Sequence, residues 1–189
     1  MNSDILKKKF DQFAQDVINE AETYTFNIKN LPDLNNYQTN IRADLKFSQM
    51  FSSLDQKLNN CLYWFEVETN DHCTNLQNLL NENRETLKTN FRTIPVKNSN
   101  SDSNVLYVGI RRGGQRKRDN LSNISGRICI HLGYYDKGST QGLQLIHWAK
   151  DVDCNINLKV VEFEDLPNDY LNTIEKIIAF KLKPLCGKH

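Results

Sequence analysis

The chain has 189 residues and a mass of 22.0 kDa, and its 24 Lys and Arg against 23 Asp and Glu give a formal net charge of +1. This length allows one sizeable core, or one domain with a helical extension. The near-neutral balance excludes a protein that binds polyanions through its overall charge, so such a partner must meet a local patch. No apolar run approaches the ~20 residues that span a bilayer, and the first residues lack a signal-peptide pattern.

The five cysteines form no C-x-x-C pair, which argues against a zinc site or a disulfide framework. A reducing compartment fits this cysteine usage best. We therefore expect a cytoplasmic protein without a membrane partner.

The apolar pattern in the first third of the chain predicts only helices. Apolar residues recur at a spacing of three to four over residues 4–22 and again over 48–58, which is typical of amphipathic helices. Residues 31–36 interrupt this regularity. These patterns predict a helical extension over residues 1–58, which either dimerises the protein or helps to grip DNA.

The remainder, residues 59–189, alternates between strand and helix patterns. Aromatic and β-branched residues predict strands over 61–67, 105–110 and 158–163. Apolar stripes predict helices over 70–92, 126–132, 143–150 and 169–182, and a polar loop covers 97–104. The pattern predicts an α+β unit with three strands.

Five side chains of this unit suit one chemistry. Tyr63 and Tyr107 lie on predicted strands, Arg127 and His131 lie one turn apart, and Glu175 borders the apolar stripe of its helix. Cutting a phosphodiester with one metal ion needs a proton acceptor, a group that holds the phosphate and a carboxylate that holds the metal. Taken singly, each residue is more often structural: a core tyrosine, a surface arginine, a satisfied histidine or a solvated glutamate.

Order and placement of these residues resemble the GIY-YIG nuclease superfamily. Cys61-Leu62-Tyr63 corresponds to the first signature strand and Tyr107-Val108-Gly109 to the second. Arg127 with His131 four residues later is similar to the family's arginine-plus-histidine helix. Glu175, just ahead of a Lys-Pro sequence, is similar to its metal-binding glutamate.

The resemblance implies a small three-stranded antiparallel sheet flanked by helices, with a helical insertion at about 70–104. It implies an endonuclease that hydrolyses DNA with Mg²⁺ (or Mn²⁺), in a restriction-like or repair-like role. Tyr63 would take a proton from the attacking water, which requires that the positive charges of Arg127 and the metal lower its pKa from about 10. Arg127 would hold the phosphate, Glu175 would bind the metal, and Tyr107 and His131 would orient the water or the phosphate.

One dense basic run follows the second tyrosine strand. Lysine and arginine side chains that neutralise phosphates supply most non-specific affinity for nucleic acid. The run is therefore either a solvated loop or a DNA contact, formed by Arg111, Arg112, Arg116, Lys117 and Arg118.

Two alternatives to a nuclease remain open. The chain is either a catalytically inactive nucleic-acid-binding module on the same fold, or a protein-interaction subunit that docks through its N-terminal helix. The sequence does not decide between DNA and RNA.

Overall fold

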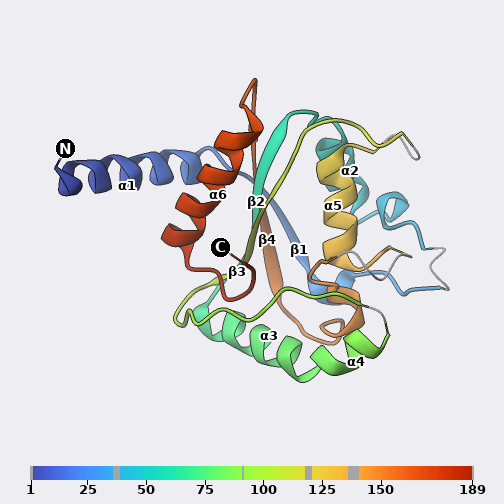
Figure 1. The fold of residues 1–189 in the computed structure, drawn as a ribbon. Helices are drawn as coiled ribbons and strands as arrows, with labels where there is room; N and C mark the ends of the chain where they lie inside the picture. The colour runs from blue at the N-terminus through green and yellow to red at the C-terminus, as the bar shows by residue number, and fades with distance from the viewer. Residues whose placement is uncertain (1, 36–38, 91, 118–120, 136–140, 189) are drawn as a thin grey trace.

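The computed structural model describes residues 2–35, 39–90, 92–117, 121–135 and 141–188. Its centre is a four-stranded, fully antiparallel sheet with the order β1-β4-β2-β3 (Figure 1). The strands are β1 (Glu22–Asn27), β2 (Asn60–Val67), β3 (Val105–Arg111) and β4 (Asn155–Phe163). The α+β class that the sequence predicted is thus confirmed.

Helices cover both faces of this sheet (Figure 1). The α-helices are α1 (Ser3–Asn19), α2 (Ser48–Asp55), α3 (Asn70–Glu82), α4 (Arg84–Thr89), α5 (Asn123–Leu132) and α6 (Asn168–Leu182). Three short 3-10 helices, η1 (Ile28–Asn30), η2 (Ile41–Ala43) and η3 (Leu145–His147), lie between them. None of the described helices is long and apolar enough to cross a membrane.

The prediction of three strands is wrong, because β1 adds a fourth. Residues 22–27 pair with β4 along their whole length, where the sequence predicted only helices before residue 58. Tyr24 and Phe26 alternate with Thr23 and Thr25 in the period of two that a strand requires. The segment is short, and only Phe26 is fully buried, so its strand pattern is weak beside the helical stripe that precedes it.

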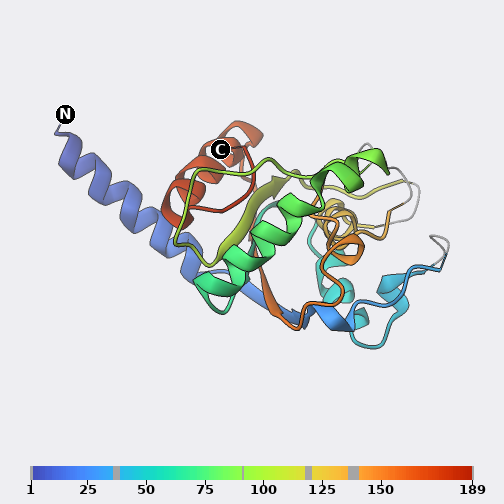
Figure 2. The same ribbon diagram turned by 90° about the horizontal axis from the view of Figure 1, so that it is seen from below.

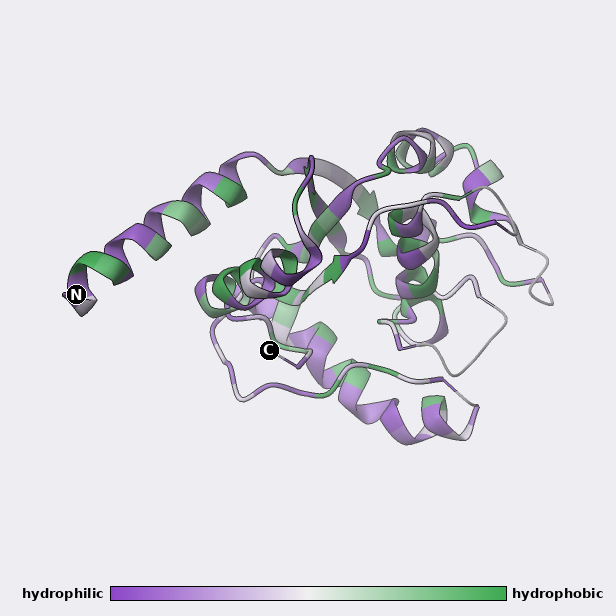
Figure 3. Cartoon of the chain, turned by 45° about the horizontal axis from the view of Figure 1, so that its top comes forward, coloured by the Kyte–Doolittle hydropathy of each residue, from purple (hydrophilic) through white to green (hydrophobic). Residues whose placement is uncertain are grey.

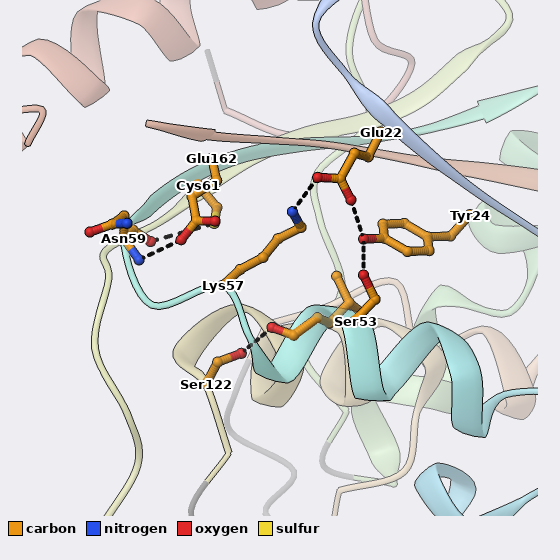
Figure 4. A network of polar contacts seen from close by, with 9 residues as sticks. Glu22, Tyr24, Ser53, Lys57, Asn59, Cys61, Ser122 and Glu162 are labelled. Atoms are coloured by element: carbon orange, nitrogen blue, oxygen red, sulfur yellow. Dashed lines mark hydrogen bonds and ion pairs between the residues drawn. The ribbon is translucent and has the colours of Figure 1, made fainter. Parts of the chain in front are cut away.

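A polar network fixes β1 to α2 (Figure 4). Lys57 Nζ donates to Glu22 Oε1 at 2.6 Å, and Tyr24 Oη donates to Glu22 Oε2 at 2.6 Å. Burial raises the pKa of Tyr24 to about 12, so its hydroxyl keeps its proton. The same hydroxyl lies 2.8 Å from Ser53 Oγ on α2. These contacts tie residues of the predicted extension directly into the sheet.

The two faces of the sheet carry separate apolar clusters. On one face, Trp64 and Val108 pack against α6 and the end of α1. On the other face, Tyr63, Phe65 and Tyr107 belong to a larger cluster that includes residues of α2, α3 and α5. Side chains alternate between the faces of a strand, so neighbours such as Tyr63 and Trp64 serve opposite cores.

Several predicted helices differ in extent. The helix predicted over 70–92 is two helices, α3 and α4, which meet at Asn83. The helix predicted over 143–150 is only the 3-10 turn η3, since Gln144 just before it adopts a left-handed φ of 59°. The helix α5 begins three residues earlier than predicted, because Ser122 caps it.

Helix α1 extends beyond the body of the molecule. Its C-terminal half packs against α6, with Ala14 and Val17 buried, while its N-terminal half projects past the other elements (Figures 1 and 2). Apolar segments nevertheless recur along the projecting part (Figure 3).

Candidate functional site

Tyr63 and Tyr107 lie side by side on one face of the sheet. Tyr63 on β2 is paired with Gly109 on β3, and Tyr107 is paired with Phe65, so the two rings are diagonal neighbours with centroids 6.2 Å apart. A Cβ atom at Gly109 would lie 2.7 Å from Tyr63 Oη and 2.7 Å from Tyr107 Cε1. Glycine at this position therefore leaves the space that both rings and the Tyr63 hydroxyl occupy.

Helix α5 brings Arg127 and His131 over the same face. Ser122 caps the helix by accepting from the backbone N–H of Ser125, and its own hydroxyl donates to the carbonyl of Leu54 at 2.7 Å. Residues four apart lie on one side of a helix. The capped first turn thus sets the direction in which Arg127 and His131 point toward the sheet.

The Tyr63 hydroxyl is the meeting point of these side chains. Arg127 Nε donates to Tyr63 Oη at 3.0 Å, and His131 Nε2 lies 3.0 Å from the same oxygen. The backbone N–H of Leu143 donates to His131 Nδ1 at 3.1 Å, so Nδ1 carries no proton. The neutral ring therefore has its hydrogen on Nε2 and donates it to Tyr63. The phenol oxygen accepts two hydrogen bonds.

His131 is enclosed by aromatic rings. Its centroid lies 5.5 Å from Tyr63, 5.0 Å from Phe65 and 4.8 Å from Tyr107. Burial, and to a lesser extent the charge of Arg127, lowers the pKa of His131 well below 6.5. The imidazole is thus a fixed, neutral hydrogen-bond donor.

The pKa of Tyr63 is raised in the absence of a metal ion. Burial raises it above its ordinary value, the neighbouring Tyr107 adds to this, and Arg127 only partly opposes them. The side chain is fully buried. Arg127 therefore does not by itself lower the pKa of Tyr63, because desolvation of the phenolate outweighs the single guanidinium.

Arg127 is held from several directions. Besides its bond to Tyr63, its Nη1 donates to the carbonyl of Gln141, and it also hydrogen-bonds with Tyr107. Burial lowers its pKa, but the oxygens of the two tyrosines raise it by more, so that the net pKa is above the ordinary value. The guanidinium is charged and its orientation is fixed before any ligand arrives.

Glu175 lies on α6, whose buried residues pack on the other face of the sheet, with Trp64 and Val108. It is half-buried, and it acts electrostatically on Tyr63 and is itself acted on by Arg127. Burial raises the pKa of its carboxyl, and Lys176 and Arg127 oppose this. Within the described ranges, its carboxylate makes no hydrogen bond or ion pair.

Glu175 is the carboxylate of this site that could contact a metal ion. The described residues contain no group of three or more His, Cys, Asp and Glu that could enclose a metal. Mg²⁺ differs from zinc in that it retains several waters and is often bound through one or two carboxylates together with substrate phosphates. The carboxylate of Glu175 could serve as one such ligand beside a phosphate, and the described residues offer no cage for a metal held by protein alone.

Part of the basic run joins the cluster. Burial has the largest effect on the pKa of Arg111 and lowers it. The charges of Arg127 and Arg116 are close enough to lower it further. The Arg116 side chain covers Gly126 on α5, where a Cβ would lie 2.5 Å from Arg116 Nη1. Arg112 and Lys117 are exposed, and Arg118 lies outside the described residues.

The loop that carries these residues is anchored by its glycines. Gly113 N–H donates to Asn60 Oδ1 at 2.9 Å, and Gly114 N–H donates to the carbonyl of Leu58 at 2.7 Å. Asn123 Nδ2, at the start of α5, donates to the carbonyl of Gly113 at 2.7 Å. The start of the basic run is therefore fixed between β2 and α5.

Sequence reasoning missed two members of the site. The carbonyl of Gln141 and the N–H of Leu143 hold Arg127 and His131, but they are backbone groups of a loop. Their side chains take no part in these bonds, so no residue pattern identifies them. The left-handed turn at Gln144 that follows them is also invisible to hydrophobic periodicity.

Comparison with known proteins gives no relative. No family model, curated protein or solved structure matches the chain.

Proposed function

We propose that the chain is a metal-dependent DNA endonuclease with GIY-YIG-type chemistry, in a restriction-like or repair-like role. The observation that carries the proposal is the convergence of residues from three separate elements, β2, β3 and α5, around the Tyr63 hydroxyl. Tyr63, Tyr107, Arg127 and His131 are in direct contact, and Glu175 lies within electrostatic reach. These are the five residues that the resemblance selects, and they are separated by up to about 110 positions in the sequence.

The charges of the cluster suit a phosphodiester. Arg111 and Arg127 bring two guanidinium groups close together, and Arg111 makes no ion pair with any described carboxylate. Two like charges at short range repel, and an anion placed between them relieves the repulsion. A guanidinium has five N–H donors in a planar fork, so Arg127 retains donors for phosphate oxygens after binding Tyr63 and Gln141.

Each protein group then has a defined task. Arg127 and Arg111 bind the phosphate and stabilise the charge that develops on it. His131 and Tyr107 keep Arg127 and the Tyr63 oxygen in place, which lowers the cost of ordering them during the reaction. Mg²⁺ or Mn²⁺ at Glu175 would neutralise phosphate charge and lower the pKa of a bound water.

Tyr63 remains the proposed proton acceptor, provided that the site holds more positive charge than Arg127 alone. Its oxygen accepts hydrogen bonds from Arg127 and His131, which favour the phenolate, while burial favours the phenol. Proton transfer to Tyr63 therefore requires more positive charge at the site than Arg127 alone provides.

The test is cleavage of supercoiled plasmid and of long genomic DNA with Mg²⁺ or Mn²⁺. Wild type is expected to cut, and Glu175→Gln, Arg127→Ala and Tyr63→Phe are each expected to reduce the rate by about 10²–10³-fold, as loss of one charge-stabilising group does. Asp169→Asn is the matched control, because it removes an exposed carboxylate from the first turn of the same helix. An unaffected Glu175→Gln rate would contradict the assignment.

The burial and raised pKa of Tyr63 favour a second candidate, a catalytically inactive nucleic-acid-binding module. This candidate predicts that no metal ion produces cleavage, and that Arg111→Ala weakens binding to labelled duplex in a gel-shift assay. Absence of both cleavage and binding would exclude both candidates.

A further inference from the structure

An apolar groove lies between α1 and α6. Leu6, Phe10 and Ala14 line it from α1, and Ile177 and Phe180 line it from α6, around a volume of about 380 Å³. Phe180 is 78% exposed and Phe10 is 46% exposed. Scattered exposed apolar residues are ordinary, whereas these two aromatic side chains border the same apolar groove.

The projecting half of α1 has little packing of its own. Its fully buried residues, Ala14 and Val17, both belong to the half that contacts the body, and Ile5 is 56% exposed. Isolated helices shorter than about 12–15 residues are marginal in water, and helices in proteins gain most of their stability from packing an apolar face. Another surface packed against the projecting half of α1 would therefore stabilise that half.

The charges of α1 are divided along its length. Its first half holds Asp4 together with Lys7, Lys8 and Lys9 and is net basic. Asp11, which pairs with Lys181 of α6, and then Asp16 and Glu20 follow in the second half and at its end, which contain no basic residue. When two such helices pack in opposite directions, the basic half of each faces the acidic half of the other. A parallel arrangement would place like charges together, which is unfavourable.

We propose that the α1–α6 groove is the interface between two copies of this chain, with the two α1 helices antiparallel about a two-fold axis. A two-fold interface uses the same patch on both copies, so it needs a self-complementary surface, and the charge division of α1 is self-complementary. The acidic second half disfavours an anionic membrane surface, for which helices carry basic residues along the polar face. The proposal does not depend on nuclease activity.

The first test is the mass of the full chain in solution, measured by sedimentation at micromolar concentration. Wild type is expected at twice 22.0 kDa. Phe10→Glu and Phe180→Glu are each expected to give the single-chain mass. Leu45→Glu, at a residue that is 95% exposed outside both helices, is the control and is expected to retain the double mass.

The second test uses exposed charges only, so that the fold is not disturbed. Lys7→Glu/Lys9→Glu and Asp16→Lys/Glu20→Lys are each expected to be monomeric alone and to form a mixed dimer when combined. A monomeric wild type would overturn the proposal. So would a dimer that survives both phenylalanine substitutions, charge variants that do not restore each other, or a monomeric wild type that binds vesicles of anionic phospholipid.

Discussion

His131 shows how one residue acts through its surroundings. Three aromatic rings and the Leu143 N–H leave no room for a second proton on the imidazole. A histidine whose pKa in the folded protein is lowered binds its proton mainly after unfolding. Its contribution to stability is therefore complete above about pH 6.5 and is lost as the pH falls toward the lowered pKa.

We expect the free energy of unfolding to decrease by up to about 1.4 kcal/mol per pH unit below pH 6.5 because of this residue. The pH dependence of chemical denaturation measures it. In His131→Gln, the contribution of this residue to the slope of unfolding free energy against pH should be lost, whether or not the substitution also changes the overall stability. His72→Gln, at an exposed position on α3, is the control and should retain the wild-type slope. An unchanged slope in His131→Gln would show that the ring is charged in the folded protein.

Among the secondary-structure elements, α5 places Arg127 and His131 over the sheet face that carries Tyr63 and Tyr107. Ser122 joins its N-terminus to α2 through the Leu54 carbonyl, and Gly133 closes its C-terminus with a left-handed φ of 98°. Both ends are therefore fixed by hydrogen bonds, and the orientation of Arg127 depends on them.

Ser122→Ala is expected to lower stability by about 1–2 kcal/mol, as loss of a helix cap does, and the melting temperature by roughly 2–4 °C per kcal/mol. It should also weaken cleavage or DNA binding, since α5 carries Arg127. Thr69→Ala removes the cap of α3, which carries none of the proposed site residues. If both variants lose stability and DNA affinity alike, α5 has no special role in the site.

The features of the fold that could be predicted from the sequence are those that hydrophobic periodicity and side-chain chemistry determine. The sequence located β2, β3 and α6, because their patterns are local and strong. The resemblance selected Tyr63, Tyr107, Arg127 and His131, which the fold brings into contact, and Glu175, which makes no hydrogen bond with them. Prediction from the sequence failed at Glu22–Asn27, a short strand with few buried residues, and at residues 143–150, where a backbone turn stops the helix. The burial of Tyr63 depends on packing between distant segments, so its pKa could not be read from neighbours in sequence.

For the whole molecule, a net charge of +1 means that any attraction to nucleic acid is local. The cluster of Arg111, Arg116 and Arg127 lies around β3, the edge strand opposite β1. Affinity that arises from few phosphate contacts should have a modest dependence on salt.

We expect Arg111→Ala to reduce the slope of log affinity against log salt concentration by about 0.9 on duplex DNA, the value for one phosphate contact. Fluorescence anisotropy at several salt concentrations measures the slope. Lys29→Ala removes a cation next to β1, at the opposite edge of the sheet, and should leave the slope unchanged. Equal effects of the two substitutions would mean that the overall charge, and not the cluster, attracts DNA.

The strand order has a consequence for how the protein is made. Strand β4, at residues 155–163, lies between β1 and β2, and it is the strand partner of β1 in the described sheet. During synthesis, β1 and β2 emerge from the ribosome long before β4 joins them. Contacts between such distant segments slow folding and leave apolar strands exposed for longer. The nascent chain thus has to hold β1 unpaired until most of its length has been translated.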